Sequence, residues 1–269
     1  MAATLLKQIG DDIKAFLKGR EQMVENPELK TSTVFNNERS LQLALAQYLI
    51  GSGNYDDVIM EYLIPKEIIA KKVAQMSDFH WGNDNMYIDI VVRKDDEYVP
   101  IELKYVTDSF TPQGNGGMAT NFLGQTYGPV EVLKRHSAQD IRCYDFWKDV
   151  KRIEFLKSTF PRVVGGFCLI LTNEKSLVKG PTDEASYRDF GLKNGSLSPR
   201  VKQWKPKIKT SEGRPGFSNK QNYPIQWIPL TLSYKAYAIF NILPGMEYVP
   251  KEPISDEKIQ FYYYLLNVI

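Results

Sequence analysis

Two apolar stretches with a charged turn between them dominate the pattern of hydrophobic and polar positions. Residues 86–92 read MYIDIVV and residues 98–106 read YVPIELKYV, and both are rich in β-branched and aromatic residues. Such runs are typical of strands that are buried on both faces. The charged residues 94–97, KDDE, predict a tight turn between them. The sequence therefore predicts a β-hairpin over residues 86–106.

Three charged side chains, Asp89, Glu102 and Lys104, interrupt these two apolar runs. Side chains alternate between the two faces of a strand, so Glu102 and Lys104 are expected to point the same way and Leu103 the other way. A charge inside a buried strand costs free energy unless it is paired or binds a metal ion. The three residues are therefore candidates for chemistry.

The rest of the chain alternates between helical and extended patterns. Apolar spacing predicts a helix over residues 3–18, ended by Gly19, and a second helix capped by Asn36 or Asn37. Further predicted elements, in chain order, are a strand over 57–64, a long glycine-rich loop over 108–128, a helix over 137–158 opened by the capping box Ser137–Asp140, a buried strand over 163–172, strand-like sequence over 225–242, and a final helix capped by Ser255.

The order helix, strand, strand, strand, helix, strand covers about residues 36–172. Together with Asp89 and the triplet Glu102-Leu103-Lys104, it resembles the PD-(D/E)XK nuclease superfamily. Ile88 stands where the family motif has its proline. The resemblance implies an α/β fold: a restriction-endonuclease-like mixed β-sheet flanked by helices, here with a C-terminal β-rich extension.

The resemblance also implies a Mg²⁺ site, in which Mn²⁺ would substitute. Its ligands would be the carboxylates of Asp89 and Glu102 and the carbonyl of Leu103, which are the hard oxygen donors that Mg²⁺ prefers. Lys104 would orient or deprotonate the attacking water and stabilise the charged transition state. The alternative is a structural Glu102–Lys104 ion pair on an exposed strand face.

A fourth carboxylate has two candidates. In many members of the family a helix carboxylate at the place of Glu38 completes the site. Glu38 would alternatively serve only the helix dipole as a first-turn acid. Glu61, in the predicted strand 57–64, is the rival, and its alternative is an outward-facing position.

Basic residues suggest two surfaces for phosphate. On the predicted helix 137–158, Arg142, Lys148 and Arg152 could contact a nucleic-acid backbone. Asp145 stands three positions before Lys148 and Asp149 three positions before Arg152, which favours a solvated ion-paired face instead.

Residues 193–220 hold eight Lys or Arg and one acid, Glu212, which predicts a basic loop or arm. Lysines neutralise phosphate and aromatic side chains stack on bases. The candidate nucleic-acid contacts in this arm are Lys202, Trp204, Lys205, Lys207 and Lys209. The alternative is a solvated loop with Trp204 packed into the body of the protein.

Composition sets the remaining limits. The chain has 269 residues, a net charge of +2 and two cysteines, Cys143 and Cys168. These values predict a single domain without a disulfide framework or a cysteine-rich zinc site, made of a core over about 36–172, the basic arm and an extension over 221–269. The two isolated histidines, His80 and His136, give no support to a histidine-based nuclease or a serine hydrolase.

The N-terminal sequence is unlike a signal peptide and no apolar run is long enough to span a bilayer, so the expected location is cytoplasmic, without membrane contact. The sequence thus predicts a Mg²⁺-dependent nuclease and favours DNA over RNA as its substrate. The alternative is a catalytically silent nucleic-acid- or partner-binding module with the same fold. A homodimer would suit double-strand cutting, but nothing in the chain requires one.

Overall fold

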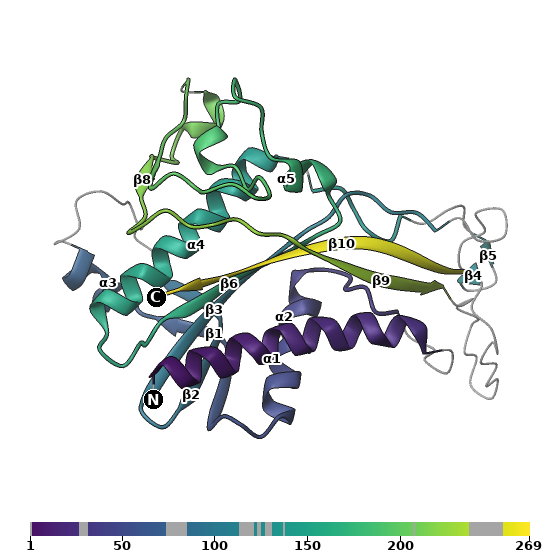
Figure 1. The fold of residues 1–269 in the computed structure, drawn as a ribbon, viewed down its shortest axis with the longest axis horizontal. Helices are drawn as coiled ribbons and strands as arrows, with labels where there is room; N and C mark the ends of the chain where they lie inside the picture. Colours follow the sequence, from purple (N-terminus) through teal and green to yellow (C-terminus); the bar gives the residue numbers. More distant parts are fainter. Residues whose placement is uncertain are drawn as a thin grey trace.

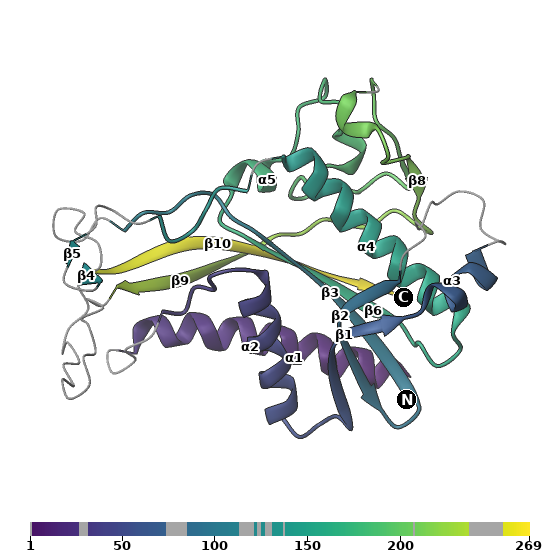
Figure 2. The same cartoon turned by 180° about the vertical axis from the view of Figure 1, so that it is seen from behind.

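A six-stranded mixed sheet with helices on both faces forms the framework of the protein (Figures 1 and 2). The computed structural model describes residues 2–26, 32–73, 85–112, 121–122, 125–126, 131–136, 138–206, 208–236 and 255–269. In spatial order the strands are β1 (Asp57–Ile64), β2 (Met86–Lys94), β3 (Glu97–Val106), β6 (Gly166–Thr172), β10 (Ser255–Val268) and β9 (Ile228–Ala236).

Two helices cover one face of this sheet and a third covers the other. The helices are α1 (Ala2–Gln22), α2 (Glu38–Gly51), α3 (Lys66–Val73), α4 (Gln139–Thr159) and α5 (Lys175–Lys179). Helices α1 and α2 lie on the opposite side of the sheet from α4 (Figure 1). Among these described helices, none combines the length and apolar character that crossing a bilayer requires.

Short elements complete the described fold. They are the 3₁₀ turns η1 (Met23–Glu25), η3 (Arg188–Phe190) and η4 (Lys209–Ser211), and the two-residue strands β4 (Asn121–Phe122), β5 (Gln125–Thr126), β7 (Val201–Lys202) and β8 (Phe217–Ser218). The strands pair as β4–β5 and β7–β8, separately from the main sheet.

The strand directions follow from the connections. β1, β2 and β3 form an antiparallel meander, and the chain then passes through α4 before β6 pairs parallel to β3. β10 and β9 add two antiparallel strands beyond β6. The predicted strands 57–64, 86–92, 98–106 and 163–172 are therefore present, with ends that differ by a few residues.

Alternation along β3 divides its side chains between the two cores, as predicted. Leu103 and Tyr105 pack on the side of α1 and α2, whereas Val106 packs with α4 and Cys168. Both cysteines are buried and free. Glu102 and Lys104 therefore point into the layer between the sheet and α4.

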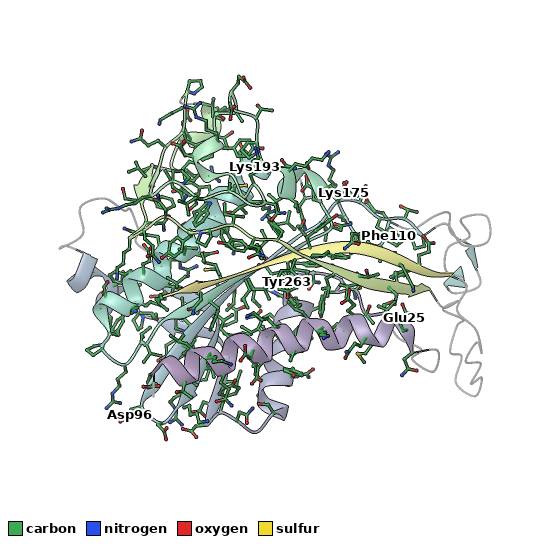
Figure 3. All side chains as sticks on the ribbon, in the orientation of Figure 1. Glu25, Asp96, Phe110, Lys175, Lys193 and Tyr263 are labelled. Atoms are coloured by element: carbon green, nitrogen blue, oxygen red, sulfur yellow. The ribbon has the colours of Figure 1, made fainter. Side chains whose placement is uncertain are left out.

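The final helix predicted after Ser255 is wrong, because residues 255–268 form the strand β10. Ile259, Phe261 and Tyr263 pack on the α1 side, whereas Tyr264 and Leu266 pack on the α4 side. Tyr263 lies along the middle of this long strand in Figure 3. Lys258 and Gln260 of β10 are exposed and alternate with buried Ile259 and Phe261, but residues 261–266 are apolar without interruption and show no period of two. The C-terminal region is thus part of the main sheet.

Helix ends agree only in part with the sequence-based expectation. Asn37 caps α2, because its Oδ1 accepts a hydrogen bond from the Ser40 amide at 2.9 Å. Gly19 does not end the first helix, which continues to Gln22. α4 begins after Ala138, which has a φ of 67° and provides no side-chain cap. Ser137, the predicted cap, lies outside the described residues.

Residues 174–227, here called the outer segment, pack on the side of α4 that faces away from the sheet. Lys175 and Lys193 mark this segment in Figure 3. Its aromatic residues form one buried cluster with those of α4: Tyr144, Phe146, Trp147, Phe190, Trp204, Phe217, Tyr223 and Trp227. The predicted basic loop over 193–220 is therefore a packed part of the protein.

Candidate active site

The ladder between β2 and β3 ends beside the two predicted strand carboxylates, Asp89 and Glu102. Its last pair is Ile90 with Ile101, so continuation would place Asp89 opposite Glu102. Instead, Oδ2 of Asp89 accepts a hydrogen bond from the Leu103 amide at 2.6 Å. The side chain of Asp89 thus takes the place of a main-chain acceptor, and the carboxylate is held against β3.

A backbone irregularity on β2 and β1 accompanies this contact. Ile88 and Val91 both pack on the α4 side although they are three positions apart, whereas Ile90 packs on the opposite face. On β1, Glu61 stands opposite Asp89 and has a φ of 51°, in the left-handed region. Such irregularities redirect side chains and are frequent beside active sites.

Gln42 of α2 holds both irregular strands. Its Nε2 donates to the main-chain oxygen of Asp89 at 2.6 Å and to Oε1 of Glu61 at 3.1 Å. Gln42 is buried, at 7% exposed. The sequence analysis missed this residue, although a polar side chain between the apolar positions Leu41 and Leu45 was a usable signal.

Glu38, in the first turn of α2, reaches β3 as well. Its Oε2 accepts a hydrogen bond from the Tyr105 amide at 2.9 Å. Its charge also acts on Lys104 and Asp89. The structure thus brings Glu38 to the strand carboxylates, whereas the Glu61 side chain, although near the main chain of Asp89, is exposed.

Glu102 and Lys104 meet two residues of α4. Nζ of Lys104 lies 2.8 Å from Oδ2 of Asp149, and Nη1 of Arg152 lies 3.1 Å from Oε1 of Glu102. The same Nη1 lies 3.0 Å from Oδ1 of Asp149. Nη2 of Arg152 also donates to the main-chain oxygen of Tyr87. Two acids and two bases therefore form a chain of ion pairs, Lys104–Asp149–Arg152–Glu102, between the sheet and α4.

This network corrects the predicted surroundings of the helix residues. The Asp149–Arg152 pair at positions i and i+3 forms as expected, but it is not on a solvated face. Asp149 is buried and the Arg152 side chain is 18% exposed. Likewise, Glu102 and Lys104 do not pair with each other on an exposed strand face.

Burial and charge act in opposite directions on the acids. Burial raises the pKa of Glu102 well above its usual range, and the neighbouring Asp149 raises it further against the effect of Arg152. Burial raises the pKa of Asp89 as well, against the charge of Lys104. Burial thus shifts both carboxyl groups toward the protonated form, and added positive charge would act in the opposite direction.

Asp149 and Lys104 of this network are held in their charged forms. Burial acts to raise the pKa of Asp149, but Lys104 and Arg152 outweigh it and lower this pKa. Burial acts to lower the pKa of Lys104, but Asp149 and the other neighbouring carboxylates outweigh it and raise this pKa. A carboxylate and an ammonium in close contact stabilise each other's charge.

The side chains of the candidate site offer the negative charge and the oxygen atoms that a divalent cation prefers. Glu38, Asp89, Glu102 and Asp149 carry four carboxylates against the two cations Lys104 and Arg152, a formal excess of two negative charges. Oε1 of Glu102 is buried without a hydrogen bond, although Arg152 lies beside it. Within the described ranges, no three His, Cys, Asp or Glu side chains already converge as a metal group. The residues therefore fit a cation by charge and atom type, with Glu102 turned toward Arg152.

The predicted nucleic-acid contacts of the basic segment need correction at Lys202. This side chain is fully buried, and its ammonium donates to the main-chain oxygens of Pro199 at 2.9 Å and Asp189 at 3.2 Å. The same ammonium lies 3.7 Å from the centre of the Trp147 ring. Lys202 is thus unable to contact a nucleic acid in this conformation.

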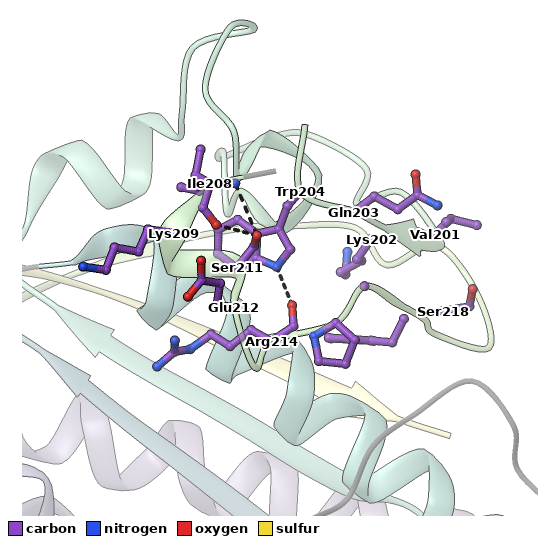
Figure 4. Close-up of a pocket in the computed structure, with 13 residues that line it drawn as sticks. Val201, Lys202, Gln203, Trp204, Ile208, Lys209, Ser211, Glu212, Arg214 and Ser218 are labelled. Carbon is purple, nitrogen blue, oxygen red and sulfur yellow. Dashed lines mark hydrogen bonds between the residues drawn. The ribbon is translucent and has the colours of Figure 1, made fainter. Parts of the chain in front are cut away.

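Trp204 is also buried, at 7% exposed, so the base-stacking prediction fails for it. Its ring packs 4.8 Å from Phe190 and 5.8 Å from Tyr144, between centroids. Its Nε1 donates to the main-chain oxygen of Arg214 at 2.9 Å (Figure 4). The alternative, with Trp204 packed into the body, is confirmed.

Lys205 and Lys209 keep side chains at the surface. Lys205 pairs with Asp189, with Nζ 3.4 Å from Oδ2. Lys209 borders an open pocket of about 1010 Å³ among residues 201–218, where Glu212 lies between Lys209 and Arg214 (Figure 4). Lys207 lies outside the described residues.

Comparison of the chain with protein-family models, with curated proteins and with solved structures found no match. The residues and contacts described above therefore carry the functional argument.

Proposed function

We propose that this protein is a divalent-cation-dependent nuclease of the PD-(D/E)XK type that hydrolyses phosphodiester bonds in DNA. The observation that carries the proposal is the proximity of Asp89, Glu102 and Lys104, whose charges act on one another where the β2–β3 ladder ends. Glu38 reaches the same place from α2. These are the residues that the family motif assigns to the reaction.

The strand arrangement supports the finer fold assignment. An antiparallel β1–β2–β3 meander is followed by α4 and by β6 parallel to β3, with α2 before the meander. This order and these directions agree with a restriction-endonuclease-like core. β10 and β9 then extend that core by two strands.

The proposed chemistry divides between the cation and the chain. When bound, a divalent cation supplies positive charge at the phosphate and lowers the pKa of a bound water. Asp89 and Glu102 would hold it, with Glu38 or the Leu103 carbonyl as further oxygen donors. Mg²⁺ accepts such a set because it binds proteins through few carboxylates and keeps several waters.

Lys104 would orient the attacking water and stabilise negative charge on the phosphate. Its ion pair with Asp149 favours the ammonium form, which donates hydrogen bonds and cannot accept a proton. Of the two roles expected from the sequence, the electrostatic one is therefore the one proposed here. Removal of such a donor costs about 100-fold or more in rate.

A catalytically silent binding module is the second candidate, because one specific contact favours it. Arg152 already provides a positive charge beside Glu102, at 3.1 Å. If this guanidinium permanently replaces the cation, the fold would bind a nucleic acid or a protein partner without turnover. Divalent-ion affinity separates the two candidates.

The test is cleavage of plasmid DNA and of a single-stranded RNA by the full chain with MgCl₂ or MnCl₂. Asp89→Asn and Lys104→Met are expected to lose about 100-fold or more in rate. Asp96→Asn and Lys175→Met are matched controls, since both side chains are exposed. DNA cleavage that is equal in all variants, or absent in the wild type, would reject the proposal, whereas faster RNA cleavage would reject DNA as the substrate.

A further inference from the structure

One guanidinium connects three parts of the candidate site. Arg152 of α4 contacts Glu102 of β3 at 3.1 Å and Asp149 of α4 at 3.0 Å, and it donates to the main-chain oxygen of Tyr87 on β2. A planar guanidinium presents several donors at once, so it can lose one partner and keep the others. The Asp149 and Tyr87 contacts would hold Arg152 in place if Glu102 moved.

Of the three contacts that Arg152 makes, the contact with Glu102 lacks a hydrogen bond. Oε1 of Glu102 lies beside Nη1 of Arg152 but is buried without a hydrogen bond. Glu102 is 2% exposed, so bulk solvent hardly reaches its carboxylate. A buried charge that is paired without good hydrogen bonds is poorly stabilised. Of the two carboxylates that Arg152 contacts, Glu102 is therefore the one more readily released to another cation.

We propose that Arg152 is an internal counter-ion of Glu102 that a divalent cation displaces, so that Arg152 lowers the metal affinity of the free protein. The inference rests on the proposed function. It assigns Arg152 a positioning role: the guanidinium holds Glu102 between the sheet and α4 until the cation takes its place. Asp149 then retains both Lys104 and Arg152 as partners.

The expected size of the effect follows from linkage. Two cations that compete for one carboxylate weaken each other's binding by the same factor, and typical coupling between linked events is about 5–150-fold. Removal of the Arg152 charge should therefore strengthen metal binding by about tenfold, within this range. An Arg152 that only supported the fold would weaken binding when removed, because the site would lose its order.

The experiment is isothermal titration of MnCl₂ and MgCl₂ into the full chain without nucleic acid. Arg152→Gln is expected to bind Mn²⁺ about tenfold more tightly than the wild type. Arg162→Gln is the matched control, because the Arg162 side chain is 65% exposed and pairs with Asp96, which is 80% exposed. Equal or weaker binding by Arg152→Gln would overturn the inference.

A second variant and a second readout protect the test against misfolding. Arg152→Lys keeps the charge but loses the fork that spans two carboxylates, so about threefold tighter Mn²⁺ binding is expected, between wild type and Arg152→Gln. Thermal unfolding should show a larger Mn²⁺-induced rise in Tm for both variants than for the wild type, since tighter binding stabilises more. A rise no larger than that of the wild type would count against the inference.

Failure of this inference differs from failure of the proposed function. One outcome is that the wild type binds Mn²⁺ and cleaves DNA in a manner that depends on Lys104. If both Arg152 variants then bind Mn²⁺ with the same affinity as the wild type, only the counter-ion role is wrong. If neither the wild type nor the variants bind Mn²⁺ and none cleaves, both proposals are wrong.

Discussion

Asp149 of α4 lies 2.8 Å from the ammonium of Lys104 on β3, and both side chains are largely buried. Lys104 stands near the end of β3 and Asp149 midway along α4, so the pair joins two distant parts of the chain. It fixes the residue expected to act on the phosphate against the helix that covers the sheet. The stability of α4 on the sheet and the position of Lys104 are thus linked.

Asp149→Ala should destabilise the protein by about 3–5 kcal/mol, because it leaves the cations of Lys104 and Arg152 without their shared carboxylate. The double variant Lys104→Met/Asp149→Leu should be less destabilised than the sum of its two single variants, by about 1–3 kcal/mol, since it removes both charges of the pair. Urea unfolding measures both quantities. Additive effects would mean that the two side chains do not interact in solution.

Gln42→Ala should cost about 1–3 kcal/mol of stability, because it leaves the buried main-chain oxygen of Asp89 without its donor. It should also weaken Mn²⁺ binding, since Asp89 loses part of the support that orients its carboxylate. Urea unfolding and metal titration check these two effects. Gln47→Ala, an exposed change on the same helix, should alter neither, and a loss of the same size there would contradict the specific role of Gln42.

The strands that carry the candidate site could be predicted because their local pattern is unambiguous. β-branched residues around Asp89 and Glu102 leave few alternatives to a hairpin, and a period of two then assigns Glu102 and Lys104 to one face. The i, i+3 spacing also gave the Asp149–Arg152 pair. It did not give the partners on β3, because contacts between α4 and the sheet depend on packing that no local spacing encodes.

Two other features could not be predicted from the sequence, for related reasons. Residues 255–268 begin with a serine followed by acids, as a helix often does. They form a strand because they pair with β6 on one side and β9 on the other. Lys202 looked like a surface charge, whereas carbonyl groups and the Trp147 ring satisfy its ammonium inside the outer segment. In both cases tertiary contacts outweigh the local preference.

Glu61→Gly should be more stable than Glu61→Ala by about 1 kcal/mol, because glycine adopts the observed φ of 51° without the strain that a Cβ brings. Both variants lose the same hydrogen bond with Gln42, so their difference isolates the backbone term. Urea unfolding of the two variants measures it. If alanine were as stable as glycine, the left-handed conformation on β1 would not be maintained in solution.

The buried ammonium of Lys202 should make stability depend on pH. Burial lowers the pKa of Lys202 from 10.5 to about 7, against the smaller effects of Asp189, Cys143 and Glu154. Between these two values the unfolded chain binds a proton at Lys202 that the folded protein does not. The contribution of Lys202 to the free energy of unfolding should therefore rise with pH above about 7, by at most about 1.4 kcal/mol per pH unit.

Lys202→Met is the variant that isolates this contribution, because methionine fills a similar volume without a charge. Urea unfolding should be measured from about pH 6 to about pH 9, a range that includes the shifted pKa of this lysine. The free energy of unfolding of the wild type should rise with pH over this range, and Lys202→Met should lack this rise. Lys193→Met, at an exposed lysine of the same segment, should keep the wild-type slope. Identical slopes for Lys202→Met and the wild type would mean that the two carbonyl oxygens and the Trp147 ring hold the ammonium charged throughout, since these contacts favour the cation and act against burial.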